Sequence, residues 1–523
     1  MNQNKSTNFV SLTKTHTIIL LLIIFISGII IRIFYTPFNV PLTLDSVNIF
    51  VYSLAFIEQG FFPTEYLRVN LGWPSLLSMF LVFFENSEML KLMNVQRIIS
   101  IIISTVTIIP IFYLTKIFFR KETAIISSAI FVFEPHLIIN SINGGTMSLF
   151  ILLVTLSILF SFKQKNNHYL LAFIFGGVAT FVRYEGFLIL IPLIFSIFIQ
   201  KNNIKGNIKK SILGIAIFFL IVIPISFIGY EADNRIIIFD QLIAGGNFVT
   251  NTMYSDELIP EEKFSKIKNN EKLQIFIIDS LIGYVKFFLL TTIPILIIGI
   301  SVSMLYIRKM TKNKIVFLIF SLFLSVAGLY AYGRGIEESK YIFPLIPIMI
   351  LLVSIPIEKI LRKTDNKKIG LIVIATVLVV SIPYIEFQKL DYQIEREIYE
   401  SALFVVANAN GVNDVPGGRF VKIAELEQNW PELPPTDERG KMGFSTKKIN
   451  IKNSFDIENY LENSKPLGLT HIVVYKENQI EFLDDIFAYE EKYPYLSKVY
   501  DSSFLGHGKH IKIFEIDYLK LGQ

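Results

Sequence analysis

The stretch TIILLLIIFISGIIIRIFYT (17–36) decides the fold class, because it is apolar almost throughout and Arg32 is its charged residue. A helix of about 20 apolar residues crosses the hydrocarbon core of a bilayer. Similar runs recur along the chain as far as Phe387. The sequence therefore predicts an α-helical polytopic membrane protein, with about eleven transmembrane helices by this length criterion. The predicted spans are 17–36, 92–118, 122–139, 145–162, 168–183, 185–200, 211–230, 277–303, 315–332, 341–358 and 369–387.

The composition agrees with a membrane bundle that carries one soluble part. Hydrophobic residues make up 52% of the 523 positions, and the mean hydropathy of +0.52 excludes an ordinary soluble domain. The net charge of +5 comes from bases beside the spans, without a basic aromatic face, so nucleic acid is not an expected partner. The chain has no cysteine, which excludes disulfides, thiolate metal sites and a thiol nucleophile.

The basic residues predict how the chain is oriented in the membrane. Short clusters of Lys and Arg fall on one side of the predicted spans, and the positive-inside rule makes that side the cytoplasm. The first cluster places the N-terminus in the cytoplasm, and an odd number of spans then places the polar region after Phe387 outside. We expect a multi-pass protein of the cell membrane. The clusters lie at 5–14, 116–121, 163–165, 201–210, 308–314 and 359–368.

Hydropathy divides the chain into two expected domains. Residues 1–387 form a transmembrane domain with outer loops at 37–91 and 231–279, and residues 388–523 form a soluble extracytoplasmic α/β domain. In the first loop, 71–84 is too short for a span and is predicted to be interfacial or re-entrant. The polar domain shows strand-like runs at 420–426, 470–476 and 510–516, and helix-like runs at 455–463 and 480–493.

The short outward loops are nearly free of basic residues, so the few charged residues that they do hold are exceptions to the positive-inside pattern. These residues are the candidate site residues. Asp45 follows the first span in VPLTLDSVNIFVYS. A carboxylate held at the membrane face can act as a base toward a hydroxyl group. An aspartate before Ser46 and Val47 is also a plausible helix start. The residues alone leave both roles open.

Two further segments concentrate charge on the outward side. TFVRYEGFLILIPLIF (180–195) places Arg183 and Glu185 in a tight hairpin between two spans. Either Arg183 simply snorkels, or the pair binds a phosphate group and holds the partner of that phosphate. GRGIEESKYIFPLIP (333–347) holds Arg334, Lys340 and Tyr341 before another span. Either Arg334 and Lys340 neutralise a leaving phosphate, or Lys340 and Tyr341 anchor the chain at the membrane interface.

A fourth candidate lies inside a predicted span. Glu134 and His136 in FVFEPHLIINS (131–141) lie toward its outer end. Ionisable groups within a membrane are costly and are functional by default, so both are possible supporting residues. The competing explanation for His136, a hydrogen-bonded core histidine, is the simpler one.

Taken in order, these motifs resemble the GT-C superfamily of integral-membrane glycosyltransferases, in the branch of protein O-mannosyltransferases and lipid A aminoarabinose transferases. The matching features are Asp45 after the first span, GWPS (72–75), RYEG (183–186) and KYIFPLIP (340–347). The resemblance covers about residues 17–387. It implies an inverting hexosyltransferase that moves a sugar from a polyprenyl- or dolichyl-phosphate donor to a protein, lipid or glycan at the outer membrane face.

The resemblance also implies roles for individual residues. Asp45 would be the general base on the acceptor hydroxyl group, while Arg183, Arg334 and Lys340 would hold the donor phosphate. Two features depart from the family pattern. SINGGTMSLF (141–150) lacks the further acidic residue of many relatives, and Ser46 replaces the acidic residue that follows the aspartate in O-mannosyltransferases. No W-W-D motif is present, which disfavours oligosaccharide transfer to asparagine.

We expect no cofactor, although Asp45, Glu134 and Glu185 leave a divalent metal ion as an open alternative. The rival function from another class is a polytopic transporter or a flippase for lipid-linked sugars. Transporters commonly show inverted repeats and midplane charges, whereas these charges gather at one surface. A third alternative, a membrane scaffold whose outer domain binds partners, leaves the outward charge clusters unexplained.

Overall fold

The structure is a computed structural model of the whole chain. It describes residues 13–43, 45–60, 62, 70–84, 87–163, 167–200, 204–227, 269–292, 296–306, 311–364, 368–413, 418–430, 447–449, 456–476, 480–508 and 510–521. The predicted outer loop 231–279 lies outside this part up to residue 268.

The chain divides into two compact units, each built from several segments. The first unit contains residues 1–36, 49–79 and 96–385, and the second contains 37–48, 80–95 and 386–523. The domain boundary predicted at 387/388 stays a prediction, because the second unit also includes two segments from the first outer loop.

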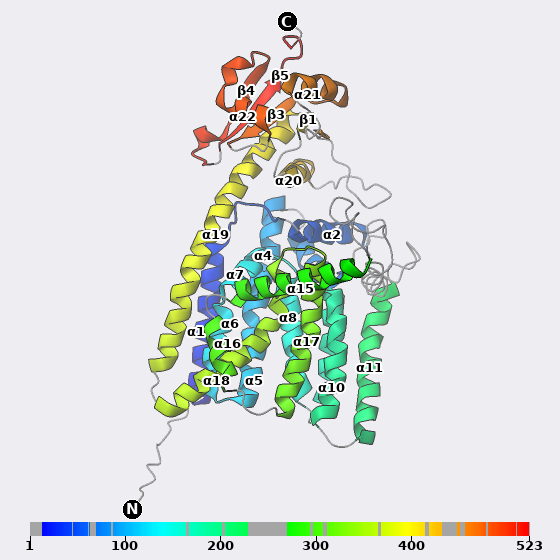
Figure 1. Ribbon diagram of the computed structural model, residues 1–523, viewed down its shortest axis with the longest axis vertical. Coiled ribbons are helices and arrows are strands. Elements are labelled where there is room, and N and C mark those ends of the chain that lie inside the picture. Colours follow the sequence, from blue (N-terminus) through cyan, green and yellow to red (C-terminus); the bar gives the residue numbers. More distant parts are fainter. Residues whose placement is uncertain are drawn as a thin grey trace, which may run out of the picture. The chain divides into compact units, whose positions relative to one another are not determined.

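Helices dominate the first unit (Figure 1). They are α1 (Lys14–Tyr35), α2 (Asp45–Gln59), α3 (Gly72–Leu81), α4 (Met89–Val106), α5 (Ile108–Phe118), α6 (Lys121–Val132), α7 (Pro135–Ile142), α8 (Met147–Phe162), α9 (His168–Val182), α10 (Leu190–Gln200), α11 (Ile204–Phe227), α15 (Asn269–Thr292), α16 (Leu296–Met304), α17 (Lys312–Gly333), α18 (Ile346–Thr364) and α19 (Lys368–Asn408). The 3₁₀ turns are η1 (Val82–Phe84), η2 (Tyr184–Ile189), η3 (Ser339–Tyr341) and η4 (Phe343–Leu345). The second unit contains η1, the first residues of α2, the end of α3, the start of α4 and the part of α19 from Glu386 onward.

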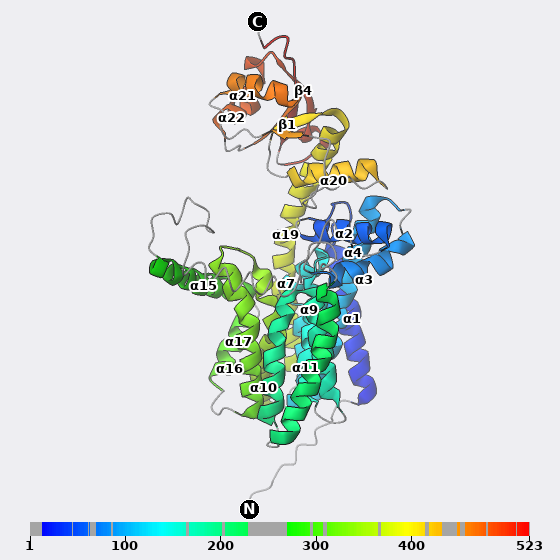
Figure 2. The ribbon, with the colours of Figure 1, turned by 90° about the vertical axis from the view of Figure 1, so that its right-hand side faces the viewer.

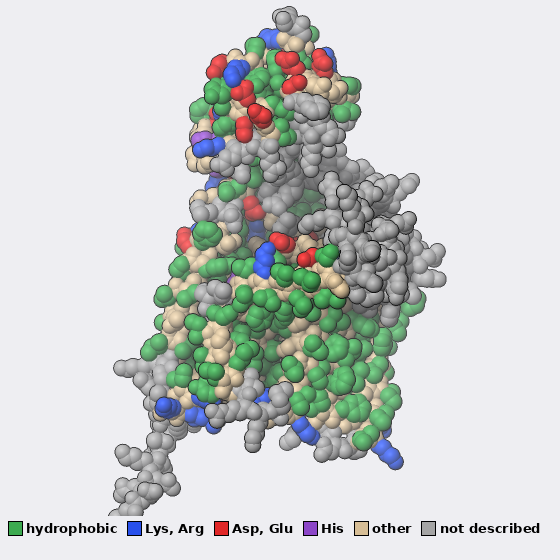
Figure 3. Space-filling view, in the orientation of Figure 1, with side chains coloured by type: hydrophobic (Ala, Val, Ile, Leu, Met, Phe, Trp, Pro, Cys, Tyr) green, Lys and Arg blue, Asp and Glu red, His purple; other side chains and the backbone are tan. Residues whose placement is uncertain are grey.

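Within the described ranges, seven helices are long and apolar enough to cross a membrane, or up to eight if the bent pair α6 and α7 forms one span. Shorter apolar helices, including α8 and α9, accompany them. The predicted α-helical polytopic membrane protein is thereby confirmed, while the larger predicted number of spans stays a prediction. On the face shown in Figure 3, apolar side chains cover the wall of this unit and Lys and Arg gather at one of its ends.

The span predicted at 277–303 is instead two helices, α15 and α16. The sequence between them contains Pro294, and a proline inside a helix removes a hydrogen bond and clashes with the preceding turn. Figures 1 and 2 show α15 lying across α17. The Tyr284 hydroxyl group lies 2.6 Å from Ser325 Oγ, which joins these two helices.

A second predicted span, 122–139, is bent by 49° between α6 and α7. The bend falls at Glu134 and Pro135, where the carboxylate of Glu134 accepts a hydrogen bond from Leu137 N and caps the new helix. Proline is well suited to the first position of a helix because its missing N–H has no partner there. The bend therefore turns a single apolar run into two helices and brings Glu134 to a helix start.

Small polar side chains join the helices inside the first unit. Ser100 and Ser148 share a hydrogen bond of 2.9 Å, and Ser127 and Ser354 share one of 2.6 Å. Buried Arg32 donates to the carbonyl oxygen of Val132 and to Ser141 Oγ. In a membrane bundle such small and polar residues allow close helix packing, because apolar burial does not favour helix contact over lipid contact.

The second unit holds a five-stranded mixed sheet with the order β2-β1-β3-β5-β4. β1 is parallel to β2 and β3, whereas β5 is antiparallel to β3 and β4. The strands are β1 (Gly411–Asn413), β2 (Lys447–Ile449), β3 (His471–Tyr475), β4 (Leu496–Asp501) and β5 (Ile511–Ile516). The remaining elements are α20 (Gly418–Asn429), α21 (Ile457–Ser464), α22 (Glu481–Ala488), η5 (Lys465–Leu467), η6 (Glu490–Lys492) and η7 (Ser502–Leu505).

The secondary structure predicted for this polar region is largely confirmed. β3 and β5 occupy the strand-like runs 470–476 and 510–516, and α21 and α22 occupy the helix-like runs. The strand predicted at 420–426 is wrong, because that segment is helix α20. Lys422 between Val421 and Ile423 resembles the alternation of a strand, but the Ala, Glu and Leu that follow at 424–426 favour a helix.

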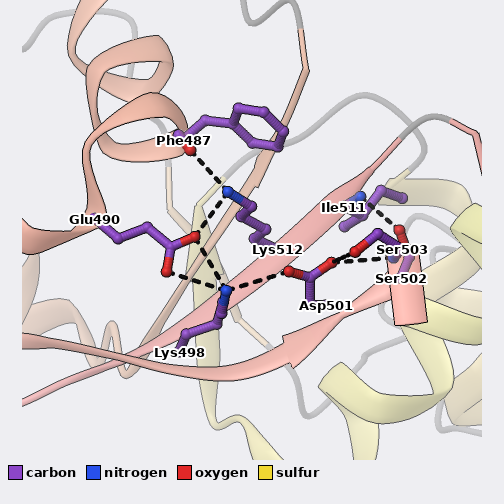
Figure 4. Close-up of polar contacts among 8 residues, drawn as sticks. All are labelled: Phe487, Glu490, Lys498, Asp501, Ser502, Ser503, Ile511 and Lys512. Carbon is purple, nitrogen blue, oxygen red and sulfur yellow. Dashed lines mark hydrogen bonds and ion pairs between the residues drawn. The ribbon is translucent and has the colours of Figure 1, made fainter. Parts of the chain in front are cut away.

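An ionic network fixes the end of the sheet (Figure 4). Lys498 Nζ donates to Glu490 at 3.1 Å and to Asp501 at 3.2 Å, and Lys512 Nζ lies 2.7 Å from Glu490. Burial raises the pKa of Glu490, but hydrogen bonds from Lys512 and Lys498 outweigh this and hold the pKa below its ordinary value. The network therefore ties β4, β5 and η6 together.

Candidate functional site

The RYEG turn is the centre of the candidate site in the first unit. Arg183 leaves α9 in extended backbone, and η2 follows directly. Its Nη2 donates to Glu185 Oε1 at 2.6 Å and its Nη1 donates to Thr146 Oγ1 at 3.2 Å. Both members of the pair are buried, with 7% of Arg183 and 8% of Glu185 exposed. The turn thus buries two opposite charges against each other, as a low-dielectric setting requires.

Close backbone packing explains the glycine of this motif. A Cβ atom on Gly186 would lie 2.5 Å from Thr180 N, so only glycine fits there. Gly72 of the GWPS segment is equally close to Val182, at 2.8 Å. Tyr184 N also donates to Asn70 Oδ1 at 3.2 Å. The segment that begins α3 therefore packs directly on the RYEG turn.

The KYIFP segment meets the RYEG turn at Tyr341. The Arg183 guanidinium carbon and Lys340 Nζ each lie 5.7 Å from the centroid of the Tyr341 ring. The Tyr332 ring packs edge-on against Tyr341 with centroids 6.2 Å apart. Cations near an aromatic face are attracted by its quadrupole. The structure thus brings together Arg183, Glu185, Lys340 and Tyr341, four of the residues predicted from the sequence.

Lys340 and Arg334 have different surroundings. Lys340 forms an ion pair with Glu338, whose backbone oxygen accepts a hydrogen bond of 3.1 Å from the Tyr332 hydroxyl group. Arg334 is exposed, and its guanidinium carbon lies 5.6 Å from the centroid of the Tyr330 ring. Lys340 therefore belongs to the cluster around Tyr341, while a phosphate contact by Arg334 stays a prediction.

One oxygen atom in this cluster lacks a hydrogen bond. Glu185 Oε2 is buried and has no hydrogen-bond partner, whereas Oε1 is held by Arg183. An unsatisfied buried polar group costs about 1–3 kcal/mol, and more when it is charged. A native fold tolerates such an atom where a ligand can supply the missing donor. The cluster therefore contains a carboxylate oxygen that can accept a hydrogen bond from a hydroxyl or amide group.

A second polar cluster surrounds Glu134 and His136. Glu134 Oε1 lies 2.7 Å from His136 Nδ1, and His136 Nε2 lies 3.2 Å from the Tyr384 hydroxyl group. The His136 ring is 6.4 Å from the ring of Phe343, in the turn that follows Tyr341. The hydrogen bonds of His136 agree with a core histidine. Its contact with Phe343 places the Glu134–His136 pair next to the KYIFP segment, so the pair supports that segment.

Asp45 is the first residue of α2, and it is exposed. It belongs to the second unit, whose residues 37–48 are followed by the rest of α2 in the first unit. Ser46 N donates to the carbonyl oxygen of Thr43, as in a turn that opens a helix. Asp45 thus occupies the helix start that the sequence allowed, and its role as a base stays a prediction.

Sequence patterns missed several residues of the site. Thr146 accepts a hydrogen bond from Arg183, whereas Asn70 and Tyr332 bind the backbone of Tyr184 and Glu338. Uncharged polar residues in or beside apolar helices give no signal that separates them from packing residues. Among the described residues, no group of three or more His, Asp or Glu side chains could hold a metal ion.

Comparisons with known proteins complete the description. The family model for dolichyl-phosphate-mannose-protein mannosyltransferase matches residues 76–228. No curated protein sequence matches the chain.

Among solved structures, the chain is similar to the oligosaccharyltransferase of Archaeoglobus fulgidus in complex with Zn and sulfate, at 13% identity and a TM-score of 0.54 over 86% of this chain and 67% of that one. The same enzyme tethered to an acceptor peptide with the NVT sequon matches at 15% identity and a TM-score of 0.50, over 88% and 69% of the chains. ArnT from Cupriavidus metallidurans bound to undecaprenyl phosphate aligns over 97% and 99% of the chains at 9% identity and a TM-score of 0.49.

Proposed function

We propose that this chain, which has the fold of the GT-C membrane glycosyltransferases, moves a sugar from a polyprenyl- or dolichyl-phosphate donor to a hydroxyl group of a protein, lipid or glycan acceptor. One observation carries the proposal. The RYEG and KYIFP segments, far apart in the sequence, meet around Tyr341 and place Arg183 and Lys340 on one aromatic ring. The family-model match, whose description names a dolichyl-phosphate sugar, supports this donor class.

Transfer of the sugar breaks the bond between its anomeric carbon and the donor phosphate. The phosphodiester becomes a phosphomonoester and gains negative charge, so a cation at that place stabilises the transition state more than the bound donor. We assign this role to Lys340. The charge of Arg183 is already neutralised by Glu185, so Arg183 holds Glu185 and Tyr341 in place and contributes its remaining N–H groups to the phosphate.

The buried carboxylate gives the site a means of recognising the sugar. Glu185 Oε2 needs a hydrogen-bond donor, and a sugar ring carries several hydroxyl groups. A hydroxyl group of the transferred sugar that donates to Oε2 would fix the orientation of the ring next to Lys340. We propose that Asp45 accepts the proton of the acceptor hydroxyl group, which attacks the face of the ring opposite the phosphate and inverts the anomeric centre.

The proposed topology places this chemistry outside the cytoplasm of the cell. Bases cluster in the loops between the helices at the end away from the RYEG turn, which supports a cytoplasmic N-terminus in the cell membrane. The domain from about residue 388 then lies on the extracytoplasmic side. Protease added to intact cells should reach a tag at the C-terminus, and a tag accessible only after permeabilisation would contradict this orientation.

The purified protein in liposomes distinguishes the enzyme from the transporter. The probe is dolichyl-phosphate mannose labelled in the sugar, with membranes of cells that lack the protein as the acceptor source. The enzyme releases dolichyl phosphate and leaves label on the acceptor. Movement of intact donor between the leaflets without release of dolichyl phosphate would instead identify a flippase.

A further inference from the structure

The side chain of Trp430 contacts a segment far away in the sequence. Trp430 follows directly after α20, and its indole Nε1 donates to the carbonyl oxygen of Ser87 at 3.0 Å. Glu427, near the end of the same helix, lies near Glu88, and burial together with this neighbouring carboxylate raises the pKa of Glu427. The end of α20 therefore rests on residues 87–88, and all of these residues belong to the second unit.

The segment that receives Trp430 continues into the first turns of α4. There Met93 Sδ accepts a hydrogen bond of 3.4 Å from Leu42 N, and Asn94 Nδ2 donates to the carbonyl oxygen of Phe38 at 2.8 Å. Leu42 and Met93 are both buried, each with 1% exposed. The start of α4 thus holds the backbone at Phe38 and Leu42 through two hydrogen bonds.

Asp45 lies at the end of that held segment. Leu42 and Thr43 precede it closely, and Ser46 N closes a turn onto the carbonyl oxygen of Thr43. Trp430 therefore holds Ser87, which lies just before α4, and the first turns of α4 hold Phe38 and Leu42 shortly before the start of α2. A general base must be held near its productive geometry, because misplacement by about 1 Å can cost about 100-fold in rate.

We propose that Trp430 is a positioning residue for Asp45, so that the C-terminal region takes part in turnover by holding the segment that carries the base. This inference rests on the proposed role of Asp45. Loss of the indole N–H should allow the segment 37–48 more conformations and lower kcat. The Michaelis constant for the donor should not change, because the proposed donor contacts come from the first unit.

The test compares Trp430→Phe, which keeps a ring but removes the N–H donor, with Tyr489→Phe at an exposed aromatic position of the same unit. We expect Trp430→Phe to lower kcat about tenfold, the upper range for one neutral hydrogen bond, with the donor KM unchanged. Tyr489→Phe should match the wild type. Asn94→Asp removes the amide donor to Phe38 and should reproduce the effect of Trp430→Phe. Agreement between these two variants would show that the effect does not come from a folding defect at position 430.

A double variant shows whether Trp430 acts through Asp45. In an Asp45→Asn background the base is gone, so adding Trp430→Phe should lower the residual turnover no further. The positioning role would be overturned if Trp430→Phe lowered the turnover of Asp45→Asn by the same factor as that of the wild type. It would also be overturned if Trp430→Phe changed only the donor KM. Either result would leave the proposed function intact. Near-normal turnover by Asp45→Asn alone would instead overturn the proposed base.

Discussion

The two units of the chain each hold a cluster of close opposite charges, and the clusters differ in how their polar atoms are satisfied. In the second unit, Glu490 accepts from both Lys498 and Lys512 at the partly exposed end of the sheet. In the first unit, Glu185 is buried with one oxygen on Arg183 and the other without a partner. A satisfied network holds strands together, whereas an unsatisfied buried carboxylate beside a cation is suited to a ligand.

The largest expected effect concerns Asp45, which lies in the second unit but should behave as part of the catalytic site. Asp45→Asn keeps the shape of the side chain and removes the base, so kcat should fall by about 10²- to 10⁴-fold, the usual contribution of general base catalysis. Expression and the melting temperature should change little. Steady-state turnover of the purified variant measures this, and a rate near that of the wild type would leave Asp45 as a helix-start residue.

The next effect concerns the geometry of the buried pair. Arg183→Lys keeps the charge but loses the forked donor that joins Glu185 to Thr146. Turnover should fall by about tenfold or more, because a hydrogen bond to a charged group is worth about 1.5–3 kcal/mol. Arg396→Lys, at an exposed ion pair of α19, provides the matched control and should be without effect. Equal results for both variants would contradict a special role of the buried Arg183–Glu185 pair.

A smaller and more selective effect is expected for Glu185. If Oε2 accepts from a sugar hydroxyl group, one singly deoxygenated donor analogue should lose about 1–3 kcal/mol of transition-state stabilisation with the wild type. With Glu185→Gln, which makes a weaker neutral contact, the same analogue should lose less. The ratio of kcat/KM for the two donors measures this interaction. A penalty that is identical in both proteins for every analogue would show that no hydroxyl group binds there.

The smallest effect belongs to the network of the second unit. Because the pKa of Glu490 is depressed in the folded state, its stabilising contribution is present above the ordinary value of 4.5 and is lost as the pH falls through the depressed pKa. Protection factors of the β5 amides in the full chain should therefore decrease in that acid range. Lys498→Met should remove part of this dependence, by less than about 1 kcal/mol for a partly exposed pair. If the pH dependence is unchanged in Lys498→Met, Lys498 contributes little to the depressed pKa of Glu490.

Charge patterning predicted the charged residues of the site, but it did not predict the uncharged residues that hold them in place. The charge pattern predicts Arg183, Glu185 and Lys340 on the outward side because they oppose the positive-inside trend. In the structure these three residues lie in the cluster around Tyr341. Which of them touch depends on helix packing, and the packing depends on residues such as Gly72 and Thr146 that carry no charge.

Apolar length predicted the membrane helices but not their breaks. The run 277–303 has the composition of a span, yet it forms α15 and α16, because hydropathy does not distinguish a helix that crosses from one that lies across its neighbours. The error at α20 has a related cause. Seven residues with partial alternation fit a strand, while the buried positions of the helix become evident only with its neighbours.

The central claim is that the cluster around Tyr341 acts on the departing phosphate, and single-turnover transfer by Lys340→Ala tests it most directly. Removal of one preorganised charge at a developing oxyanion usually costs about 10²- to 10³-fold in rate. We expect a loss of that size in the single-turnover rate with dolichyl-phosphate mannose, little change in its dissociation constant, and no loss for Lys498→Ala. An unchanged single-turnover rate for Lys340→Ala, or an equal loss for both variants, would contradict the account.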